Sequence, residues 1–394
     1  MTSLFRQMAA VISMTIGGLP SRFWGSVTTI LSIALVVATL LAFLAMSNGF
    51  TKTVAGTGSD DIAMILGTGS EAELNSTMSS EAVRLLEEAP GIARDAAGRP
   101  ITSPELYVVV GANRRAGGGE ANVSLRGVTS RAPDLRTGFR LSSGRMFEPG
   151  TNEMIVGAGV VREFRGFDLD TELQLGGSAW KVVGIFEVPG TVFDSELWAD
   201  LPVVQSLFNR GPTVQALRAR LESTAALAEI QSFVDSEPRL QVDVKTEKEH
   251  FASEAQSLQY LVYFGWALSI TLGFGALAGA LNTMYAAVEA RSKELATLRA
   301  IGFGGLPAFA GAITESIVLA LAGGLVGAGG AYLLFNGLTA STLGGGFTQV
   351  VFDFNIGPQQ VLAGVQLALL LGLLGGIFPA LRAARTPLLK LGAD

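Results

Sequence analysis

The sequence predicts a membrane protein with four transmembrane α-helices and an α+β extracytoplasmic domain inserted between spans 1 and 2. Three observations predict this fold class. Four apolar segments each exceed the roughly 20 residues that a helix needs to cross a bilayer. Hydrophobic residues make up 49% of the 394 residues and charged residues only 16%, which is too apolar for an average soluble protein. Acidic and basic residues are also segregated along the chain.

The charge distribution predicts the orientation. Residues 49–256 contain 29 acidic and 20 basic residues, whereas the rest of the chain has a small basic excess. Basic residues flank the apolar segments in three clusters: Arg6 and Arg22, then Arg291, Lys293 and Arg299, then Arg382, Arg385 and Lys390. Since cytoplasmic flanks are rich in Lys and Arg, we expect a multi-pass protein of the cell inner membrane with both termini cytoplasmic. The acidic excess argues against nucleic-acid binding.

The first two elements are apolar. Residues 1–22 are expected to form an interfacial helix on the cytoplasmic face, with a disordered start as the alternative. Residues 23–48 form the first span. Its apolar run is longer than the roughly 7–15 residues of a signal peptide, so we expect an uncleaved anchor.

Residues 49–256 are too many for a loop and must fold as a domain. Period-two apolar patterns and turn residues predict strands, and 3.6-residue patterns predict helices. The expected strands are 62–66, 107–110, 123–128, 154–156, 172–175, 180–186 and 240–244. The expected helices are 81–88, 214–222 and 225–234. A polar stalk helix at 245–257 then leads into the second span.

The remaining spans are 258–285, 313–335 and 361–381, with a short extracytoplasmic loop at 336–360 and a cytoplasmic tail at 382–394. Small residues let membrane helices approach closely. Four glycines are therefore expected at helix contacts: Gly323, Gly327, Gly372 and Gly376. The Gly323–Gly327 spacing fits either a dimer or an intrachain seam. Glu315 is costly if it faces lipid, so we expect it at a helix interface or among headgroups.

A charged segment at 286–307 separates spans two and three. Its residues are good helix formers, and glycines from Gly302 onward end it. Glu289 and Lys293 have the spacing of an ion pair on one helix face. The residues alone indicate either a lever through which a cytoplasmic partner protein would act on the membrane part, or a connecting helix whose charges mark a cytoplasmic loop.

The sequence lacks the residues that several kinds of catalysis and metal binding require. The chain has no cysteine and one histidine, His250, which excludes disulfides, thiolate catalysis and histidine-cluster metal sites. It has no phosphate-binding loop with a Gly-Lys-Ser/Thr ending. Asp168, Asp170 and Glu172 lack the rest of a calcium loop and are interpreted as surface carboxylates. We therefore predict no catalytic or metal-binding residue.

Two motifs resemble those of MacB/FtsX-type ABC transporter permeases. Residues 288–302 resemble the coupling helix of that family at nine positions, namely Val288, Arg291, Glu294, Leu295, Ala296, Arg299, Ala300, Ile301 and Gly302, but Ala290 stands where the family usually has Glu. Residues 379–387, Pro-Ala-Leu-Arg-Ala-Ala-Arg-Thr-Pro, resemble its C-terminal motif. Three weaker likenesses, at 141–147, 153–159 and 180–186, occur in the family's order.

The resemblance implies a non-catalytic permease subunit that couples ATP hydrolysis by a cytoplasmic ATPase to movement of the extracytoplasmic domain. The substrate would be hydrophobic, lipid-linked or a peptide, to be exported or extracted. ATP and magnesium would bind the partner ATPase. Other implied partners are a second permease, identical or related, a possible periplasmic adaptor and membrane lipids. The residues expected to couple to the ATPase are Glu289, Arg291, Lys293, Glu294, Leu295, Leu298, Arg299, Ile301 and Gly302.

Two other functions stay open at this stage. The same architecture serves a transmembrane regulator, resembling FtsX, that activates a cell-wall hydrolase or senses peptides. An anchored extracytoplasmic enzyme is the third hypothesis, which the missing catalytic residues make remote.

Overall fold

The computed structural model contains two compact units. The helical unit comprises residues 1–48, 260–338 and 354–394, and the sheet unit comprises residues 49–259 and 339–353. The described residues are 2–18, 20–115, 119–256, 259–343 and 349–385. The units are described separately below.

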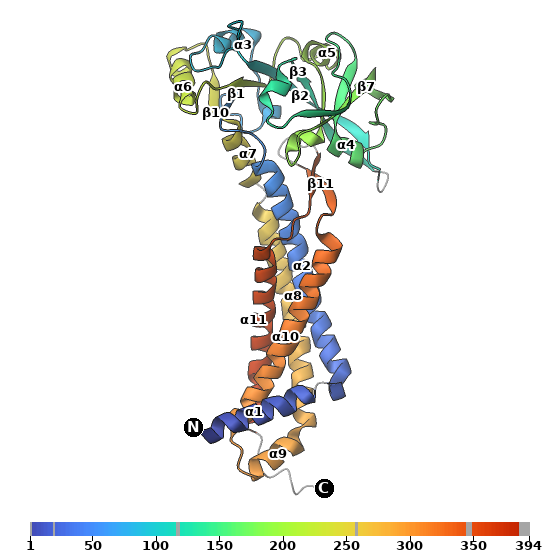
Figure 1. Ribbon diagram of the computed structural model, residues 1–394, viewed down its shortest axis with the longest axis vertical. Helices are drawn as coiled ribbons and strands as arrows, with labels where there is room; N and C mark the ends of the chain where they lie inside the picture. Colours follow the sequence, from blue (N-terminus) through green and yellow to red (C-terminus); the bar gives the residue numbers. More distant parts are fainter. Residues whose placement is uncertain (1, 19, 116–118, 257–258, 344–348, 386–394) are drawn as a thin grey trace. The chain divides into compact units, whose positions relative to one another are not determined.

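The helical unit confirms the prediction of four apolar spans. The spanning helices are α2 (Phe23–Ala55), α8 (Gln259–Ala290), α10 (Gly305–Phe335) and α11 (Pro358–Ala384), which run side by side in Figure 1. Helix α1 (Thr2–Gly17) lies across one end of them, and a 3-10 turn at Pro20–Arg22 joins it to α2. The described α1 is helical, as the interfacial-helix interpretation expects.

Glycines set the closest approaches between the spanning helices. A Cβ on Gly327 would lie 2.5 Å from the Ala34 carbonyl oxygen, and one on Gly323 would lie 2.9 Å from that of Ile30. Gly323 and Gly327 of α10 therefore form an intrachain seam with α2. On α11, Gly372 and Gly376 meet α10, where their Cβ atoms would lie 2.4 Å and 2.7 Å from the Cβ atoms of Ala320 and Ser316.

The sheet unit confirms the α+β prediction. Its ten strands are β1 (Ile62–Gly67), β2 (Thr102–Asn113), β3 (Glu120–Val128), β4 (Arg140–Gly144), β5 (Glu153–Gly157), β6 (Glu172–Leu175), β7 (Ser178–Glu187), β8 (Glu196–Asp200), β9 (Ala216–Arg220) and β10 (Val242–Thr246). They follow the order β10-β1-β9-β2-β3-β8-β5-β7-β4, with β6 on β7. The long hairpin β2–β3 pairs with β9 on one side and β8 on the other, and so joins the two halves of the sheet.

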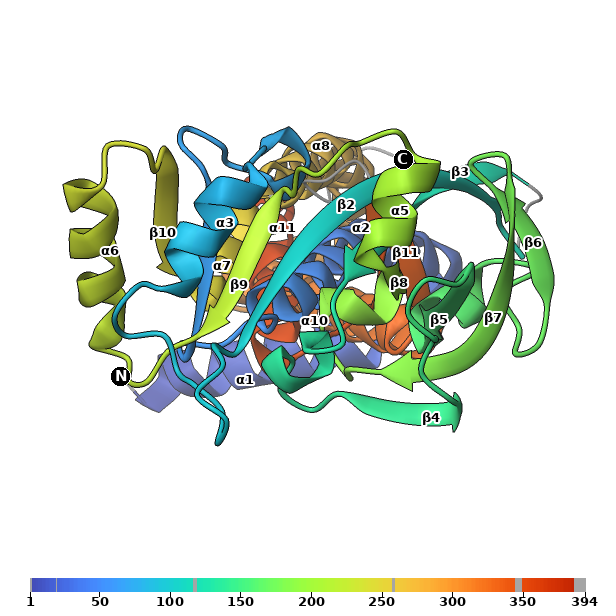
Figure 2. The same ribbon diagram turned by 90° about the horizontal axis from the view of Figure 1, so that it is seen from above.

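Helices cover parts of this sheet. They are α3 (Ser80–Glu87), α4 (Ala158–Glu163), α5 (Leu201–Leu207), α6 (Ala226–Ser236) and α7 (Glu247–Gln256). Helix α5 packs on β2 and β3, as the view in Figure 2 shows. The core beneath contains fully buried side chains from both halves of the sheet, including Leu125, Trp180 and Leu217.

One helix prediction for the sheet unit is wrong. Residues 214–222 were expected to be helical, but residues 216–220 form β9, between β1 and β2. Pairing on both edges there outweighs the helix propensity of Ala, Leu and Arg. The loop predicted at 336–360 contains the hairpin β11 (Thr339–Leu343) and β12 (Gln349–Asp353).

The β11–β12 hairpin belongs to the sheet unit. The Val351 amide donates a hydrogen bond of 2.9 Å to Ser195 Oγ, and Ser341 Oγ donates one of 2.9 Å to Glu163 Oε1. A Cβ on Gly159 would meet Val351 at 3.4 Å. The chain between α10 and α11 is thus a docked hairpin.

Candidate functional site

The predicted coupling segment is a short helix, α9 (Ser292–Ala300), set off from α8 by a break at Arg291. Gly302, with φ at +97°, ends it, because this left-handed backbone suits glycine. The expected single helix from 286 onward is therefore interrupted at Arg291, with Glu289 in the last turn of α8 and Lys293 in the first turn of α9. Glu289 Oε2 lies 3.1 Å from Arg382 Nη2 of α11.

One face of α9 contacts the rest of the helical unit. Ala296 is fully buried. Leu298 lines a cavity of about 30 Å³ together with Val11 of α1. Arg299 Nη1 donates a hydrogen bond of 3.3 Å to the Ala384 carbonyl oxygen at the end of α11. A displacement of α9 would therefore act directly on α1 and α11.

The opposite face of α9 is exposed. Lys293 and Thr297 are exposed, Glu294 has a side chain 63% exposed, and Ile301 is 69% exposed. The side chain of Leu295 lies outside the described residues. The exposed face combines both charge signs with an apolar residue, as a protein-docking surface does.

Arg291 connects α9 to the spanning helices. Its guanidinium lies 3.3 Å from Glu294 Oε2, 3.3 Å from Thr15 Oγ1 of α1 and 3.8 Å from Glu315 Oε2 of α10. Glu315 also pairs with Arg22, at 3.0 Å between Oε1 and Nη1. The structure thus places Glu315 at a helix interface between two arginines. The sequence did not predict this pairing, because Arg22 and Glu315 are far apart in the chain.

The sheet unit contains a second group of charges, called here the ion cluster. It consists of three arginines and four glutamates, all buried: Glu73, Glu105, Arg126, Arg136, Glu196, Arg218 and Glu247. They come from β2, β3, β8, β9, α7 and the turns at Glu73–Asn75 and before Arg136. Charged residues within otherwise apolar strands, such as Arg218 in Ala-Leu-Arg-Ala, were the sequence signal for it.

The contacts of the ion cluster join α7 to the sheet. Arg218 Nε lies 2.7 Å from Glu247 Oε1 of α7, and its Nη2 lies 2.9 Å from Glu73 Oε1. Arg218 also pairs with Glu105. Arg126 binds Glu73 at 2.5 Å and Glu196 at 2.6 Å. Buried, multiply bonded ion pairs are rigid, and breaking one leaves a charge without compensation.

Burial and pairing shift the pKa values of these groups in different directions. Burial alone would raise the pKa of Glu73, but the charges of Arg126 and Arg218 outweigh it and hold that pKa well below its usual range. Burial opposes the charge of Arg218, yet its three carboxylate partners raise its pKa. Burial lowers the pKa of Arg136, which Glu105 only partly offsets. Among the three arginines of the ion cluster, Arg136 is thus the one whose burial is least compensated by neighbouring carboxylates.

Helix α7 carries two further titratable groups, the buried His250 and the half-buried Glu254. Burial lowers the pKa of His250 to about 4 and raises the pKa of Glu254 to about 7. His250 Nε2 lies 3.7 Å from Glu254 Oε1, and neither ring nitrogen hydrogen-bonds to a described residue. His250 is therefore neutral and part of the protein interior at neutral pH.

Surface carboxylates of the sheet unit pair with arginines. Asp168 Oδ1 lies 2.7 Å from Arg115 Nη2. Over the described residues, no group of three or more His, Asp and Glu side chains is placed to hold a metal ion.

These features define a class of protein: a multi-pass membrane protein with a large domain between its first two spans and a charged helix between its second and third. Two family models match the chain. The MacB-like periplasmic core domain matches residues 26–236, and the FtsX-like permease C-terminal domain matches residues 266–388. The chain belongs to this family: it is a MacB/FtsX-type ABC transporter permease, a family that works with a cytoplasmic ATPase.

Solved structures show only distant likeness. The extracellular domain of the noncanonic ABC-type transporter YknZ from Gram-positive bacteria is 15% identical, with 47% of this chain and 100% of that chain covered and a TM-score of 0.35. The periplasmic region of MacB from Actinobacillus actinomycetemcomitans is 12% identical, with 49% of this chain and 92% of that chain covered and a TM-score of 0.36. No curated protein matches the chain.

Proposed function

We propose that this permease transmits ATP-driven movement of a cytoplasmic ATPase through α9 to the sheet unit, and so exports or extracts a hydrophobic, lipid-linked or peptide substrate. It would act in the inner membrane, with both termini cytoplasmic, as a dimer with an identical or related permease. ATP and magnesium would bind the ATPase, and an adaptor outside the membrane would be optional.

One observation carries the proposal: α9 has an exposed mixed face and an opposite face bonded to the helical unit. A force on Lys293, Glu294 and Ile301 would reach α10 through the Arg291–Glu315 contact and α11 through the Arg299–Ala384 hydrogen bond. Rigid elements with defined contacts transmit displacement, whereas a solvated loop would absorb it.

The ion cluster supports the second half of the transmission. Helix α7 directly precedes α8 in the chain, and Glu247 at its start pairs with Arg218 of strand β9. Movement of α8 along its axis would therefore reach the sheet through a buried ionic contact.

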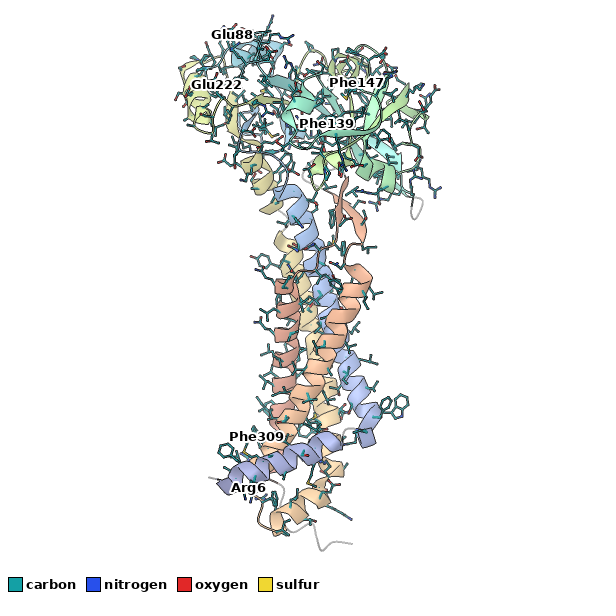
Figure 3. All side chains as sticks on the ribbon, viewed as in Figure 1. Arg6, Glu88, Phe139, Phe147, Glu222 and Phe309 are labelled. Carbon is teal, nitrogen blue, oxygen red and sulfur yellow. The ribbon has the colours of Figure 1, made fainter. Side chains whose placement is uncertain are left out.

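The placement of α9 side chains determines the test. Leu298 and Arg299 contact the permease itself, so Asp at both positions would disturb internal packing as well as docking. Lys293→Glu with Ile301→Asp changes two exposed residues. Arg6→Glu, an exposed charge change on α1 (Figure 3), is the matched control.

The measurement is transport-dependent stimulation of the partner ATPase by the permease in proteoliposomes. We expect the α9 double variant to lose at least tenfold in stimulation while it inserts and purifies normally, and Arg6→Glu to resemble the unaltered protein. Full stimulation in the double variant would show that α9 is not the docking element.

A further inference from the structure

A cavity of about 380 Å³ lies among the ends of α2, α8 and α10, beside α9. Such a volume is within the range of roughly 300–1,000 Å³ found for ligand sites. Most of its wall is apolar and small, with Met284 and Ala287 of α8 and Leu319 of α10. Met284 and Leu319 are only 2% and 4% exposed.

The entrance of the cavity has the composition of a membrane–water boundary. Phe23 and Trp24, at the start of α2, line it and are 58% and 78% exposed. Exposed Trp at the end of a spanning helix is typical of the headgroup level. The helix α1, which precedes them, lies across the same end of the helical unit in Figure 1.

Arg22 supplies unused hydrogen-bond donors to this cavity. Its Nη1 and Nη2 atoms are buried, and neither makes a hydrogen bond with any residue in the described parts of the chain. The 3.0 Å contact of Nη1 with Glu315 Oε1 is therefore an ion pair without hydrogen-bond geometry. A buried guanidinium whose hydrogen bonds are incomplete costs free energy even when it is ion-paired, so a further acceptor in the cavity, which Glu315 also lines, would stabilise this end of the protein.

The charges around Arg22 favour an anionic acceptor. Glu315 is shared between Arg22 and Arg291, and the other carboxylate near Arg291, that of Glu294, is 63% exposed and so screened by water. A phosphate offers several acceptor oxygens to one guanidinium. The neighbouring cavity of about 30 Å³ is of water size and too small for a phosphate ester.

We propose that the larger cavity binds one anionic phospholipid, with its phosphate at Arg22 and its acyl chains along the apolar wall of α8 and α10. The bound lipid would bridge the ends of three spanning helices next to the Arg22–Glu315–Arg291 contact. A free phosphate would leave the apolar wall exposed to water, whereas a lipid covers both parts of the site.

The test uses the fluorescence of Trp24 in the full-length protein, purified and placed in nanodiscs. Trp266→Phe leaves Trp24 as the tryptophan of the spanning helices, since Trp180 and Trp198 are buried within the sheet unit. Phosphatidylglycerol or phosphatidylcholine with brominated acyl chains is then added at equal mole fractions, because bromine quenches tryptophan on contact.

We expect brominated phosphatidylglycerol to quench Trp24 at about fivefold lower mole fraction than brominated phosphatidylcholine, the preference expected from one basic side chain near the membrane surface. Arg22→Gln should bring this ratio close to one, Arg22→Lys should retain most of it, and Arg6→Gln should leave it unchanged. Ala287→Leu, which narrows the cavity, should weaken quenching by both lipids.

Two results would overturn the proposal. The first is an undiminished ratio in Arg22→Gln when the emission of Trp180 and Trp198 shows an intact sheet unit. The second is abolition of the preference by millimolar inorganic phosphate, which would identify a simple anion site. Native mass spectrometry offers an independent readout: one phosphatidylglycerol should stay with the protein and be lost in Arg22→Gln.

Discussion

The ion cluster predicts that two buried arginines differ sharply in their effect on stability. Arg218 and Arg136 both have fully buried side chains. Arg218 pairs with Glu73, Glu105 and Glu247, whereas Arg136 pairs with Glu105 at 2.8 Å. Two nitrogens of Arg136, Nε and Nη1, are buried without a hydrogen-bond partner among the described residues.

The magnitudes follow from what each substitution leaves behind. Arg218→Met removes the shared cation of three buried carboxylates, so we expect a loss of about 3–5 kcal/mol in the free energy of unfolding. Arg136→Met leaves Glu105 bound to Arg126 and Arg218 and removes two unsatisfied donors. Since replacing a poorly compensated buried charge by an apolar group is often neutral, we expect a change within about 1 kcal/mol.

The assay is urea unfolding of the full-length protein in detergent, followed by tryptophan emission in a Trp24→Phe, Trp266→Phe background. Trp198 reports directly on the ion cluster because its Nε1 donates a hydrogen bond of 2.7 Å to Glu196 Oε2 and its ring lies 5.3 Å from the Arg136 guanidinium. An Arg136→Met variant as unstable as Arg218→Met would refute the idea that pairing, rather than burial alone, determines the contribution of each arginine.

Three further predictions concern other parts of the chain. Between pH 4.5 and 6.5, the raised pKa of Glu254 (about 7) makes the free energy of unfolding fall as pH rises, while the lowered pKa of His250 (about 4) makes it rise, so the two contributions offset each other. In Glu254→Gln only the contribution of His250 remains, so the free energy of unfolding should increase by about 2 kcal/mol over this pH range, measured from urea midpoints. An unchanged flat profile would contradict the raised pKa of Glu254. Gly327→Ala should lower the free energy of unfolding by about 1–3 kcal/mol, because the added Cβ overpacks against Ala34. Gly330→Ala, where a Cβ meets nothing within 4 Å, should leave thermal unfolding unchanged. Equal losses of stability in the two variants would argue against the α2–α10 seam. Ser195→Ala should speed hydrogen exchange of the Val351 amide at least fivefold, since it removes a hydrogen bond worth about 1 kcal/mol, and unchanged exchange would mean that the β11–β12 hairpin is held by other contacts.

The spans and the helix-packing glycines were predictable because membrane burial leaves a signal in each segment separately. A helix in lipid needs about 20 apolar residues and satisfies its own backbone. The small residues Gly323 and Gly327 are likewise visible in the sequence as sites of close helix packing. Only the structure shows that their partner is α2.

Long-range pairing was not predictable from local patterns. Strand β9 has good helix formers, and its two strand partners come from residues far away in the chain. The break at Arg291 coincides with contacts of that residue with Thr15 and Glu315, which are far from it in the sequence. The ion cluster unites seven residues between 73 and 247. A charge within an apolar strand, such as Arg218, indicates burial but does not show which distant residues it pairs with.

The central claim, that this permease is the membrane subunit for a separate ATPase, is tested most directly by affinity purification of the tagged full-length protein from native membranes. We predict that a soluble ATPase with a Gly-Lys-Ser/Thr phosphate-binding loop co-purifies with it, and that the Lys293→Glu, Ile301→Asp variant recovers much less of that ATPase than Arg6→Glu does. Recovery of intact, well-folded permease without any ATPase would contradict the claim and favour a stand-alone sensor or anchor.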